Sequence, residues 1–412
     1  MNQLLCNSKL QDIQDKIQSG ERLNFEDGVR LFESNDLPFL GALAHQVRLR
    51  LNQKKVYYSI NLHLNHTNVC TAHCVFCAFA RRPHEEGGYT FNLEQIREKV
   101  TDGVKRFNIN EVHIVGGLNP ELGMDFYTEM FRLIRQDHPH LYIKALTAVE
   151  IDDLAKRFHL TWNDVLSQFK EAGLNGLPGG GAEIFNEVTR RKICADKTTS
   201  ADWIEVHRTA HEMEMPTNCT MLYGHIESVE DRVDHILRLR ALQDETHGFQ
   251  SFIPLAFNAE NTPLEKKGEP GGYTDLKVYA ISRLLFDNVP HIKVHWTTLD
   301  LKMAQTSLFF GVNDVGGTNL NEKIMHDAGN ETPVDLSELA LRSLIEKAGF
   351  EPTLVDSSYG TEGSRSVTPA KAGVQSTLDS RRSNRTVPED QAANRRSTDW
   401  RLRGNDIKDE KS

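Results

Sequence analysis

The chain has 412 residues, of which 39% are hydrophobic, and its formal net charge is −10. This length accommodates one large α/β barrel or two ordinary domains, and the acidic balance disfavours a nucleic-acid partner, because phosphate binding requires a basic surface. No apolar run approaches the roughly 20 residues of a membrane span, and the first residues do not have the pattern of a signal peptide. We therefore expect a cytoplasmic protein without a membrane partner.

Helices are expected over residues 1–55, because "GVRLFES" and "PFLGALAHQVRLRLNQKK" place apolar residues at helical spacing. From residue 56, short apolar strands alternate with amphipathic helices. The predicted strands are "VYYSINLHL", "EVHIVGG", "LYIKALTA", the short "LNGLPGGG", "PTNCTMLYGH", "SFIPLAF" and "HIKVHW". Predicted helices between them include "LEQIREKVTDGVKRF", "MDFYTEMFRLIRQ", "VEDRVDHILRLRALQ" and "TDLKVYAISRLLFD". Repeated βα units of this kind predict a (β/α)8-type TIM barrel over residues 56–312.

Residues 313–360 are expected to form a C-terminal extension that closes the barrel. From Thr361 the chain is rich in Ser, Arg, Asp and Asn and poor in large apolar residues. Such a composition cannot bury enough surface to offset its ordering entropy, so residues 361–412 are expected to be a disordered tail. Its piece "VTPAKAGVQSTLDSR" resembles the translation of a repetitive genomic element, which favours a passive tail; an Arg-rich segment that binds a partner is the alternative.

Three cysteines, Cys70, Cys74 and Cys77, are clustered in "NVCTAHCVFCAFAR". In a reducing compartment such a cluster indicates metal binding or catalysis. A zinc site would need His66 or His73 as a fourth ligand, since no second ligand pair follows. A catalytic thiol would need only one cysteine and a base. A 4Fe–4S cluster fits better, because three thiolates leave one iron open to the amino and carboxylate groups of a small molecule.

Polar and glycine residues follow the other predicted strands, where a barrel carries its chemistry. The pair Gly116-Gly117 would allow the backbone to approach a ligand closely. Glu150 and Glu183 are candidates for binding the same ligand, and capping or solvated carboxylates are the alternative for each. The candidates for substrate contacts are Tyr223, Asn258, His225 as a proton donor or acceptor, and Arg190 and Arg191 for carboxylate recognition.

The spacing C-x3-C-x-F-C resembles the motif of the radical S-adenosylmethionine (SAM) superfamily, in which Phe76 occupies the aromatic position beside the third cysteine. Longer stretches, among them "HIVGGLNPEL", "GLPGGGAEIF", "TNCTMLYGHIE" and "AISRLLFDNVPHIKVHW", are similar to the aminofutalosine (aminodeoxyfutalosine) synthase family of that superfamily. The resemblance extends to about Gly360. It implies that the three cysteines ligate the 4Fe–4S cluster and that the glycine pair faces the methionine amine of SAM.

The resemblance also implies the reaction, which composition and spacing do not reveal. Family members are radical SAM adenosyl transferases of menaquinone biosynthesis. They add the 5′-deoxyadenosyl radical to 3-[(1-carboxyvinyl)oxy]benzoate, so SAM is consumed as a substrate. The products are 6-amino-6-deoxyfutalosine, methionine and bicarbonate, and the cluster takes its electron from a donor such as flavodoxin or ferredoxin.

Three alternatives remain at this point. The first is the sister enzyme that cyclises dehypoxanthine futalosine, the second a radical enzyme of deazaflavin assembly, and the third a noncatalytic protein with a structural metal site. Two positions depart from the family pattern, since Asn119 stands where histidine is expected and His66 where an aromatic residue is usual. The stretch "EKIMHDAGN" retains Glu322, Lys323 and His326. The departures bear on the residues around the substrate and leave the cysteines intact.

Overall fold

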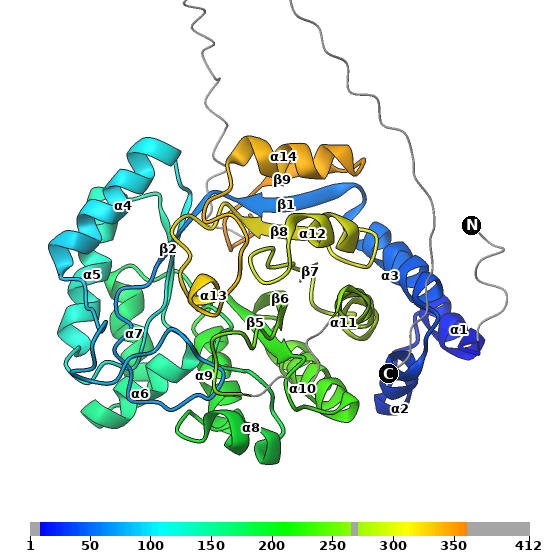
Figure 1. Cartoon of the computed structure of the whole chain (residues 1–412), viewed down its shortest axis with the longest axis horizontal. Coiled ribbons are helices and arrows are strands. Elements are labelled where there is room, and N and C mark those ends of the chain that lie inside the picture. The colour runs from blue at the N-terminus through cyan, green and yellow to red at the C-terminus, as the bar shows by residue number, and fades with distance from the viewer. Residues whose placement is uncertain (1–8, 265–270, 361–412) are drawn as a thin grey trace, which may run out of the picture. The chain divides into compact units, whose positions relative to one another are not determined.

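The computed structural model describes residues 9–264 and 271–360. Three helices open this part of the chain, α1 (Gln11–Ser19), α2 (Phe25–Glu33) and α3 (Leu37–Asn52). They lie at one side of the strands in Figure 1, where α3 packs against α11 (Gly272–Leu285) and α2 against α10 (Val229–Thr246). The expectation of N-terminal helices is confirmed. The predicted tail from Thr361 lies outside the described residues.

In the part of the chain that the structure describes, the strands form three sheets of three strands each, and every neighbouring pair is parallel. The strand order is β8-β1-β9 in the first sheet, β2-β3-β4 in the second and β5-β6-β7 in the third. Their bounds are β1 (Lys55–Ser59), β2 (Asn61–Leu64), β3 (Glu111–Ile114), β4 (Tyr142–Ala145), β5 (Thr217–Tyr223), β6 (Phe249–Ala256), β7 (His291–Ile292), β8 (Asp314–Gly317) and β9 (Glu351–Leu354).

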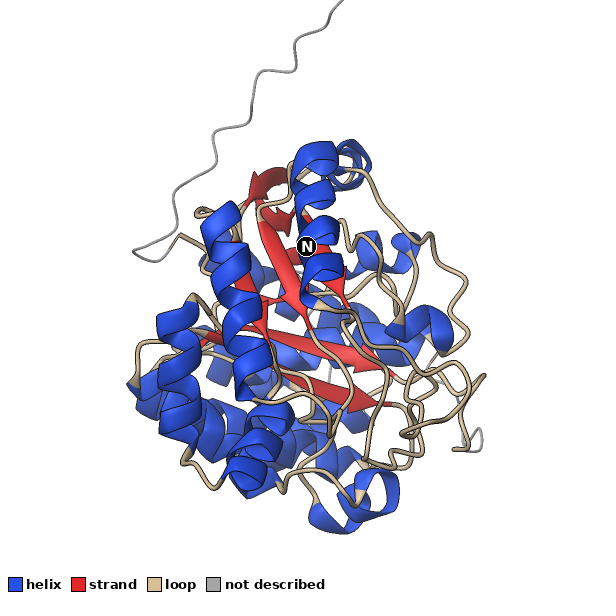
Figure 2. Cartoon of the chain, turned by 90° about the vertical axis from the view of Figure 1, so that its left-hand side faces the viewer, coloured by secondary structure: helices blue, strands red, loops and turns tan. Residues whose placement is uncertain are grey.

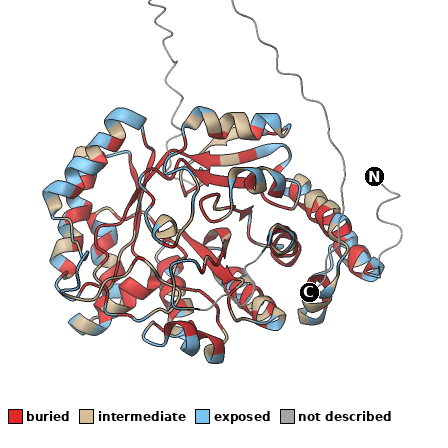
Figure 3. Cartoon of the chain, viewed as in Figure 1, coloured by how far each residue is buried: buried red, intermediate tan, exposed pale blue. Residues whose placement is uncertain are grey.

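Helices surround the strands, as Figures 1 and 2 show. Those that follow β2 are α4 (Leu93–Phe107), α5 (Met124–Asp137), α6 (Ala148–Phe158), α7 (Trp162–Ala172), α8 (Glu187–Cys194), α9 (Ser200–Glu212), α10, α11, α12 (Leu301–Ser307), α13 (Ile324–Asp327) and α14 (Glu338–Lys347). Burial follows this arrangement, because in Figure 3 the strands are mainly buried while the helices alternate between buried and exposed residues. The main apolar core therefore lies between the strands and the helices.

Capping explains why several helices begin where the sequence predicted them. Asn92 accepts a hydrogen bond from the Gln95 main chain, and the Gln95 side chain accepts one from the Asn92 main chain. The same reciprocal capping box begins α6, α7 and α10. It satisfies amide groups that the first helical turn leaves without partners. The helices predicted from "LEQIREKVTDGVKRF", "MDFYTEMFRLIRQ" and "VEDRVDHILRLRALQ" are confirmed.

The strands differ from the prediction in four respects. The predicted strand "VYYSINLHL" divides into β1 and β2, which belong to different sheets. The predicted strand "LNGLPGGG" forms only isolated bridges, at Gly176 and Leu177. The stretch "HIKVHW" yields only the two-residue strand β7, because beyond Ile292 the pairing continues through a single bridge, Lys293 to Asp314. Two strands that were not predicted, β8 and β9, lie in the segment 313–360 and both pair with β1. Among the described residues, no helix combines the length and apolar character that crossing a bilayer requires.

A buried histidine makes the stability of this fold depend on pH. The ring of His235 on α10 is 0% exposed, stacks on Phe185 at 3.9 Å and bonds through Nε2 to the Thr220 carbonyl at 2.8 Å. Burial lowers its pKa from 6.5 to about 3. Below pH 6.5 the unfolded chain therefore binds a proton that the folded chain does not, and stability falls by about 1.4 kcal/mol per pH unit from this group.

The variant His235→Gln is expected to remove that contribution, since a glutamine amide can still donate to the Thr220 carbonyl but does not titrate. Between pH 7 and pH 5, its free energy of unfolding should fall by about 2 kcal/mol less than that of the unmodified protein. Urea unfolding at the two pH values measures the difference. Equal pH dependence in the two proteins would show that His235 is already protonated in the folded state.

Candidate active site

The three clustered cysteines lie on the loop that follows β2. Cys70 is buried, Cys74 and Cys77 are half-buried, and all three are free thiols. The loop folds back on itself, because the Cys70 amide donates to the Arg81 carbonyl and the Arg81 amide to the Asn68 carbonyl, both at 2.8 Å. The Cys77 amide donates to the Cys74 carbonyl at 3.2 Å. The fold therefore presents three free thiols from one braced loop at the end of a strand.

The surroundings of these thiols suit thiolates bound to iron. The main-chain amide of Leu118 donates to Cys70 Sγ at 3.3 Å, a contact that stabilises negative charge on sulfur. Burial raises the pKa of Cys74 to about 12, while nearby Lys197 acts to lower it. Deprotonation of Cys74 thus requires a compensating positive charge, which a metal cluster supplies. The donor set fits a 4Fe–4S cluster, whose irons are ligated by cysteine.

The two histidines considered for a zinc site have other partners. His66 Nε2 lies 3.2 Å from the Tyr127 hydroxyl, and His73 Nδ1 lies 2.8 Å from an Asp196 carboxylate oxygen on an exposed part of the loop. Within residues 9–264 and 271–360, no three His, Cys, Asp or Glu side chains are arranged to hold a single metal ion. The geometry does not bring a histidine to the cysteines.

The glycine pair Gly116-Gly117 follows β3 and packs directly against the cysteine loop. A Cβ atom on Gly117 would overlap the carbonyl of Val69 and lie 2.9 Å from Cys70 Cβ. On Gly116 it would lie 2.6 Å from His66 Cε1 and 2.9 Å from the Thr67 carbonyl oxygen. Side chains are therefore excluded at both positions by the loop that carries Cys70.

Glu150 holds the glycine pair to the start of α6. Its carboxylate accepts from the Gly116 amide at 3.2 Å and from the Thr147 amide at 2.6 Å. It also belongs to the capping box of α6. Burial raises its pKa to about 7. Glu150 thus has the capping role that the sequence left open, and the same contacts fix the main chain of Gly116.

A partly buried ion pair lies beside the cysteine loop. Glu183 Oε1 is 2.7 Å from Lys197 Nζ, and Lys197 Nζ lies 5.2 Å from the centre of the Phe76 ring. Burial acts to raise the pKa of Glu183, but Lys197 outweighs it and the pKa lies below its usual value. Glu183 also has a positive φ of 47°, a strained conformation for a residue with a side chain. Glu183, Phe76 and Cys74 therefore share one lysine neighbour.

The two predicted carboxylate-binding arginines differ in their surroundings. The guanidinium of Arg190 is buried and donates to the main-chain carbonyls of Gly181, Ala182 and Thr198 at 2.6–3.0 Å. Its donors are thus committed to the main chain around Glu183, and it supports that segment rather than offering a free cation. Arg191 lies on the exposed side of α8.

Three further candidates lie at the ends of β5 and β6. The hydroxyl of Tyr223 donates to Asp275 on α11 at 2.7 Å, so this side chain belongs to the packing between strand and helix. His225 is buried, with Nε2 3.1 Å from the Leu222 carbonyl and Nδ1 3.2 Å from Glu227. Asn258 is half-buried and accepts from the Glu260 amide at 3.2 Å.

Lys197 is the main site residue that sequence reasoning missed. It stands in "KICADKTT", between α8 and α9, in a stretch that matches no motif. Only the fold brings it to Cys74 and Glu183. Asn119, which departs from the family pattern, donates to Thr90 Oγ1 at 2.9 Å and to Thr67 Oγ1 at 3.2 Å. It therefore braces the turn after the glycine pair.

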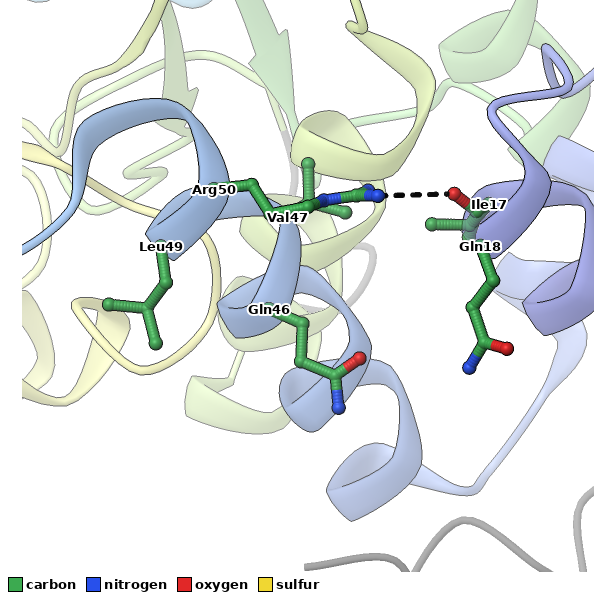
Figure 4. Close-up of a pocket in the computed structure, with 6 residues that line it drawn as sticks. All are labelled: Ile17, Gln18, Gln46, Val47, Leu49 and Arg50. Atoms are coloured by element: carbon green, nitrogen blue, oxygen red, sulfur yellow. Dashed lines mark hydrogen bonds between the residues drawn. The ribbon is translucent and has the colours of Figure 1, made fainter.

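Of two surface depressions, one is separate from this cluster of residues and the other borders the cysteine loop. One of about 420 Å³ lies between α1 and α3, where Figure 4 shows Arg50 donating to the Ile17 carbonyl at 3.5 Å. None of its lining residues comes from the cysteine loop or the strand ends. A smaller one of about 150 Å³ lies between residues 83–88 of the cysteine loop and the turn at Asn119–Glu121. Neither contains Cys70, Cys74 or Cys77 among its lining residues.

Comparisons with known proteins agree with the chemistry of the cysteine loop. Residues 64–239 match the radical SAM superfamily, and residues 246–367 match the CofH/MqnC C-terminal region. An aminodeoxyfutalosine synthase from Thermus thermophilus is 44% identical over 355 residues, which cover 85% of this chain and 95% of that protein.

Two relatives with other names are less similar. A 5-amino-6-(D-ribitylamino)uracil–L-tyrosine 4-hydroxyphenyl transferase from Methanopyrus kandleri is 38% identical and covers 75% of this chain and 85% of its own length. A cyclic dehypoxanthine futalosine synthase from Halalkalibacterium halodurans is 35% identical, and the aligned region covers 84% of this chain and 93% of that protein. Among solved structures, methylornithine synthase superposes with a TM-score of 0.68 at 18% identity, covering 84% of this chain and 98% of that one. This similarity shows a TIM-barrel-like fold.

Proposed function

The chain belongs to the aminodeoxyfutalosine synthase family of radical SAM enzymes, and from that premise we propose that it joins the 5′-deoxyadenosyl group of SAM to 3-[(1-carboxyvinyl)oxy]benzoate. The products are 6-amino-6-deoxyfutalosine, methionine and bicarbonate, in menaquinone biosynthesis. The observation that carries this proposal is the 44% identity over nearly the whole relative. Three free thiols at the end of a strand agree with it.

A 4Fe–4S cluster and SAM are the cofactors of this superfamily, and we assign Cys70, Cys74 and Cys77 as the cluster ligands. When bound, the reduced cluster supplies one electron that cleaves SAM to methionine and the 5′-deoxyadenosyl radical. The Leu118 amide stabilises the sulfur of Cys70. Braced by the hydrogen bonds to Arg81 and Asn68, the loop holds its thiols in place before the cluster binds.

The residues beside the loop are suited to bind SAM. Gly116 and Gly117 bring the main chain after β3 directly against the cysteine loop, and Glu150 fixes the Gly116 amide. Lys197 provides a buried ammonium for a carboxylate, and Glu183 an acceptor for an amine or a ribose hydroxyl. Phe76 packs beside Lys197. Arg190 acts as a positioning residue that holds the main chain on both sides of Glu183.

The aromatic substrate is then expected at the strand ends beyond the cysteine loop. Leu222, Phe257 and Ala259 form a small apolar cluster against which Phe76 and Leu255 pack. Such a surface suits an aryl ring. His225 lies at the same strand ends as a proton donor or acceptor, and Asn258 as a hydrogen-bonding group, whereas Tyr223 and Arg191 have no contact that supports a substrate role.

The division of the chain follows the same proposal. We infer that the three sheets are arcs of one (β/α)8 barrel, with residues 1–55 as preceding helices and 313–360 as the extension that contributes its last strand. Isolated parallel bridges support this inference, because they link neighbouring sheets in cyclic order: Lys144–Gly176, Leu177–Thr217, Lys293–Asp314 and Leu62–Leu320. A cytoplasmic location and a flavodoxin or ferredoxin as electron donor remain predictions.

Removing the ammonium of Lys197 is expected to weaken SAM binding about 10- to 100-fold, the value of one charge-assisted hydrogen bond. Lys197→Met removes the charge but keeps much of the apolar stem, while Lys197→Arg keeps the charge as the matched control. Equilibrium dialysis of the reconstituted protein measures the dissociation constant. Iron content should stay unchanged in Lys197→Met, and equal SAM affinity in all three proteins would contradict the role of Lys197.

A parallel assay separates the proposed reaction from those of the two less similar relatives. The anaerobically reconstituted and reduced protein is offered 3-[(1-carboxyvinyl)oxy]benzoate, dehypoxanthine futalosine, or tyrosine with 5-amino-6-(D-ribitylamino)uracil, each with SAM. Mass spectrometry should detect a new product only with the enol-ether benzoate. A product from either other mixture, with none from the benzoate, would assign the chain to the corresponding relative's reaction.

A further inference from the structure

A group of basic side chains lies on the face of the strands opposite the helices. On β3, Val112 and Ile114 are 0% exposed and belong to the apolar core between strands and helices. Residues of a strand alternate between faces, so His113 lies on the other face. The register pairs His113 with His63 on β2 and with Lys144 on β4. The strand interior therefore carries basic groups rather than apolar ones.

Three histidine rings meet on this face. The rings of His63 and His113 stack with centres 4.7 Å apart, and His295 meets His63 edge-on at 6.1 Å. We call these residues the histidine cluster. His63 is 8% exposed, whereas His113 and His295 keep more accessible surface. Burial strongly lowers the pKa of His113 and lowers that of His295 to about 4. His295 Nδ1 bonds to the Thr297 hydroxyl, so a ligand would meet His295 through Nε2.

The charges around the histidine cluster are already balanced within the chain. Lys144 Nζ lies 2.6 Å from Glu111 Oε1, and Lys293 Nζ lies 3.5 Å from Asp314 Oδ2. Glu111 also accepts from the Ser357 amide at 2.7 Å. Because Glu111 and Asp314 are each paired with a lysine, neither carboxylate is free to accept a hydrogen bond from the histidine rings.

Some hydrogen-bonding groups in and beside the histidine cluster have no partner among the described residues. No hydrogen bond joins the His113 ring to any residue that the structure describes. Asn319 is 2% exposed and its Nδ2 has no partner, although its Oδ1 accepts from Asn61, which contacts His63. Buried polar groups are almost always hydrogen-bonded. The buried, unpartnered Asn319 Nδ2 therefore indicates a polar ligand that carries acceptor atoms.

We propose that the histidine cluster, together with Asn319, binds the ring carboxylate of the aromatic substrate. This inference rests on the proposed function. The enol-ether double bond must lie near the cysteine loop, where the adenosyl radical forms, so the carboxylate on the far side of the ring lies away from that loop. In this arrangement the aryl ring lies against the apolar cluster of Leu222, Phe257 and Ala259, on which Phe76 of the cysteine loop also packs. Each histidine N–H donates to a carboxylate oxygen.

The test compares the substrate with its analogue that lacks only the ring carboxylate, phenyl enolpyruvyl ether. The unmodified holoenzyme should show a KM about 10- to 100-fold lower for the carboxylated compound, the value of one or two hydrogen bonds to a charged group. His113→Phe keeps a ring of similar size without an N–H. Its KM for the carboxylated compound should approach that for the analogue, while its KM for the analogue stays unchanged.

Two further variants complete the design. His138→Phe is the matched control, since this ring bonds to Thr101 between α4 and α5. Its ratio of KM values for the two compounds should equal that of the unmodified protein. His295→Phe replaces His113→Phe in the test if the latter does not fold. Its KM for the carboxylated compound should likewise approach that for the analogue. Full discrimination retained by a folded His113→Phe or His295→Phe overturns the inference. Absence of any adduct in the unmodified holoenzyme overturns the proposed function, and the inference with it.

Discussion

Alanine in place of Cys74 is expected to abolish both cluster binding and product formation. The three cysteines supply all the thiolates that the loop offers, and a cluster with two protein ligands loses one of its anchored irons. After anaerobic reconstitution, the unmodified protein should contain about four irons per chain, and Cys74→Ala less than about one. Absorption of the cluster and SAM-derived methionine should disappear together, because electron transfer from the cluster starts the reaction.

The chain provides a matched control for this substitution in Cys194. This cysteine is also free and only 1% exposed, and its charge interaction with Lys197 shows that it lies near the same lysine as Cys74. Cys194→Ala should keep the iron and the activity, at a cost to stability of about 1 kcal/mol for the lost buried atom. Loss of iron from Cys194→Ala, or its retention in Cys74→Ala, would contradict the ligand assignment.

Adding one methyl group at Gly117 is expected to have an effect nearly as large. The new Cβ would overlap the Val69 carbonyl and approach Cys70 Cβ to 2.9 Å. Both neighbours belong to the cysteine loop, so the clash cannot be relieved by turning a side chain. Overpacking of this kind costs about 3 kcal/mol or more, and we expect Gly117→Ala to bind little iron and to lose SAM cleavage.

Gly271→Ala is the control for Gly117→Ala, because nothing lies within 4 Å of a Cβ at that position. It should bind iron and cleave SAM as the unmodified protein does. The two measurements are iron content and methionine released after reduction. If Gly117→Ala retains both, the close packing of the glycine pair on the cysteine loop does not matter for the site.

Local patterns predicted much of this fold because their causes lie within a few residues. The helix from Leu93 to Phe107 begins at a reciprocal cap between Asn92 and Gln95, and both residues are visible in the sequence. The cysteine motif is likewise local, because it is recognised from the spacing of Cys70, Cys74 and Cys77 along the chain. In contrast, β8 consists of Asp-Val-Gly-Gly, in which three of the four residues are of types depleted in strands. It is a strand only because β1 pairs with it.

Contacts between distant segments explain what the sequence did not reveal about the site. Arg190 was predicted to bind a carboxylate, but its donors bond to carbonyls around Glu183 and at Thr198, a use that only the folded main chain reveals. Lys197 was not singled out, because a lone lysine in a polar stretch carries no signal. Its importance arises when α8 and the following turn bring it to Glu183 and Cys74.

The most direct test of the central claim follows the adenosyl group itself. The reconstituted, reduced protein is incubated with 3-[(1-carboxyvinyl)oxy]benzoate and SAM that carries ¹³C throughout its adenosine. We predict that the labelled adenosine carbons appear in the aromatic product, with one methionine released for each product formed. Label found only in 5′-deoxyadenosine, with an aromatic product of unlabelled mass or none, would contradict the account.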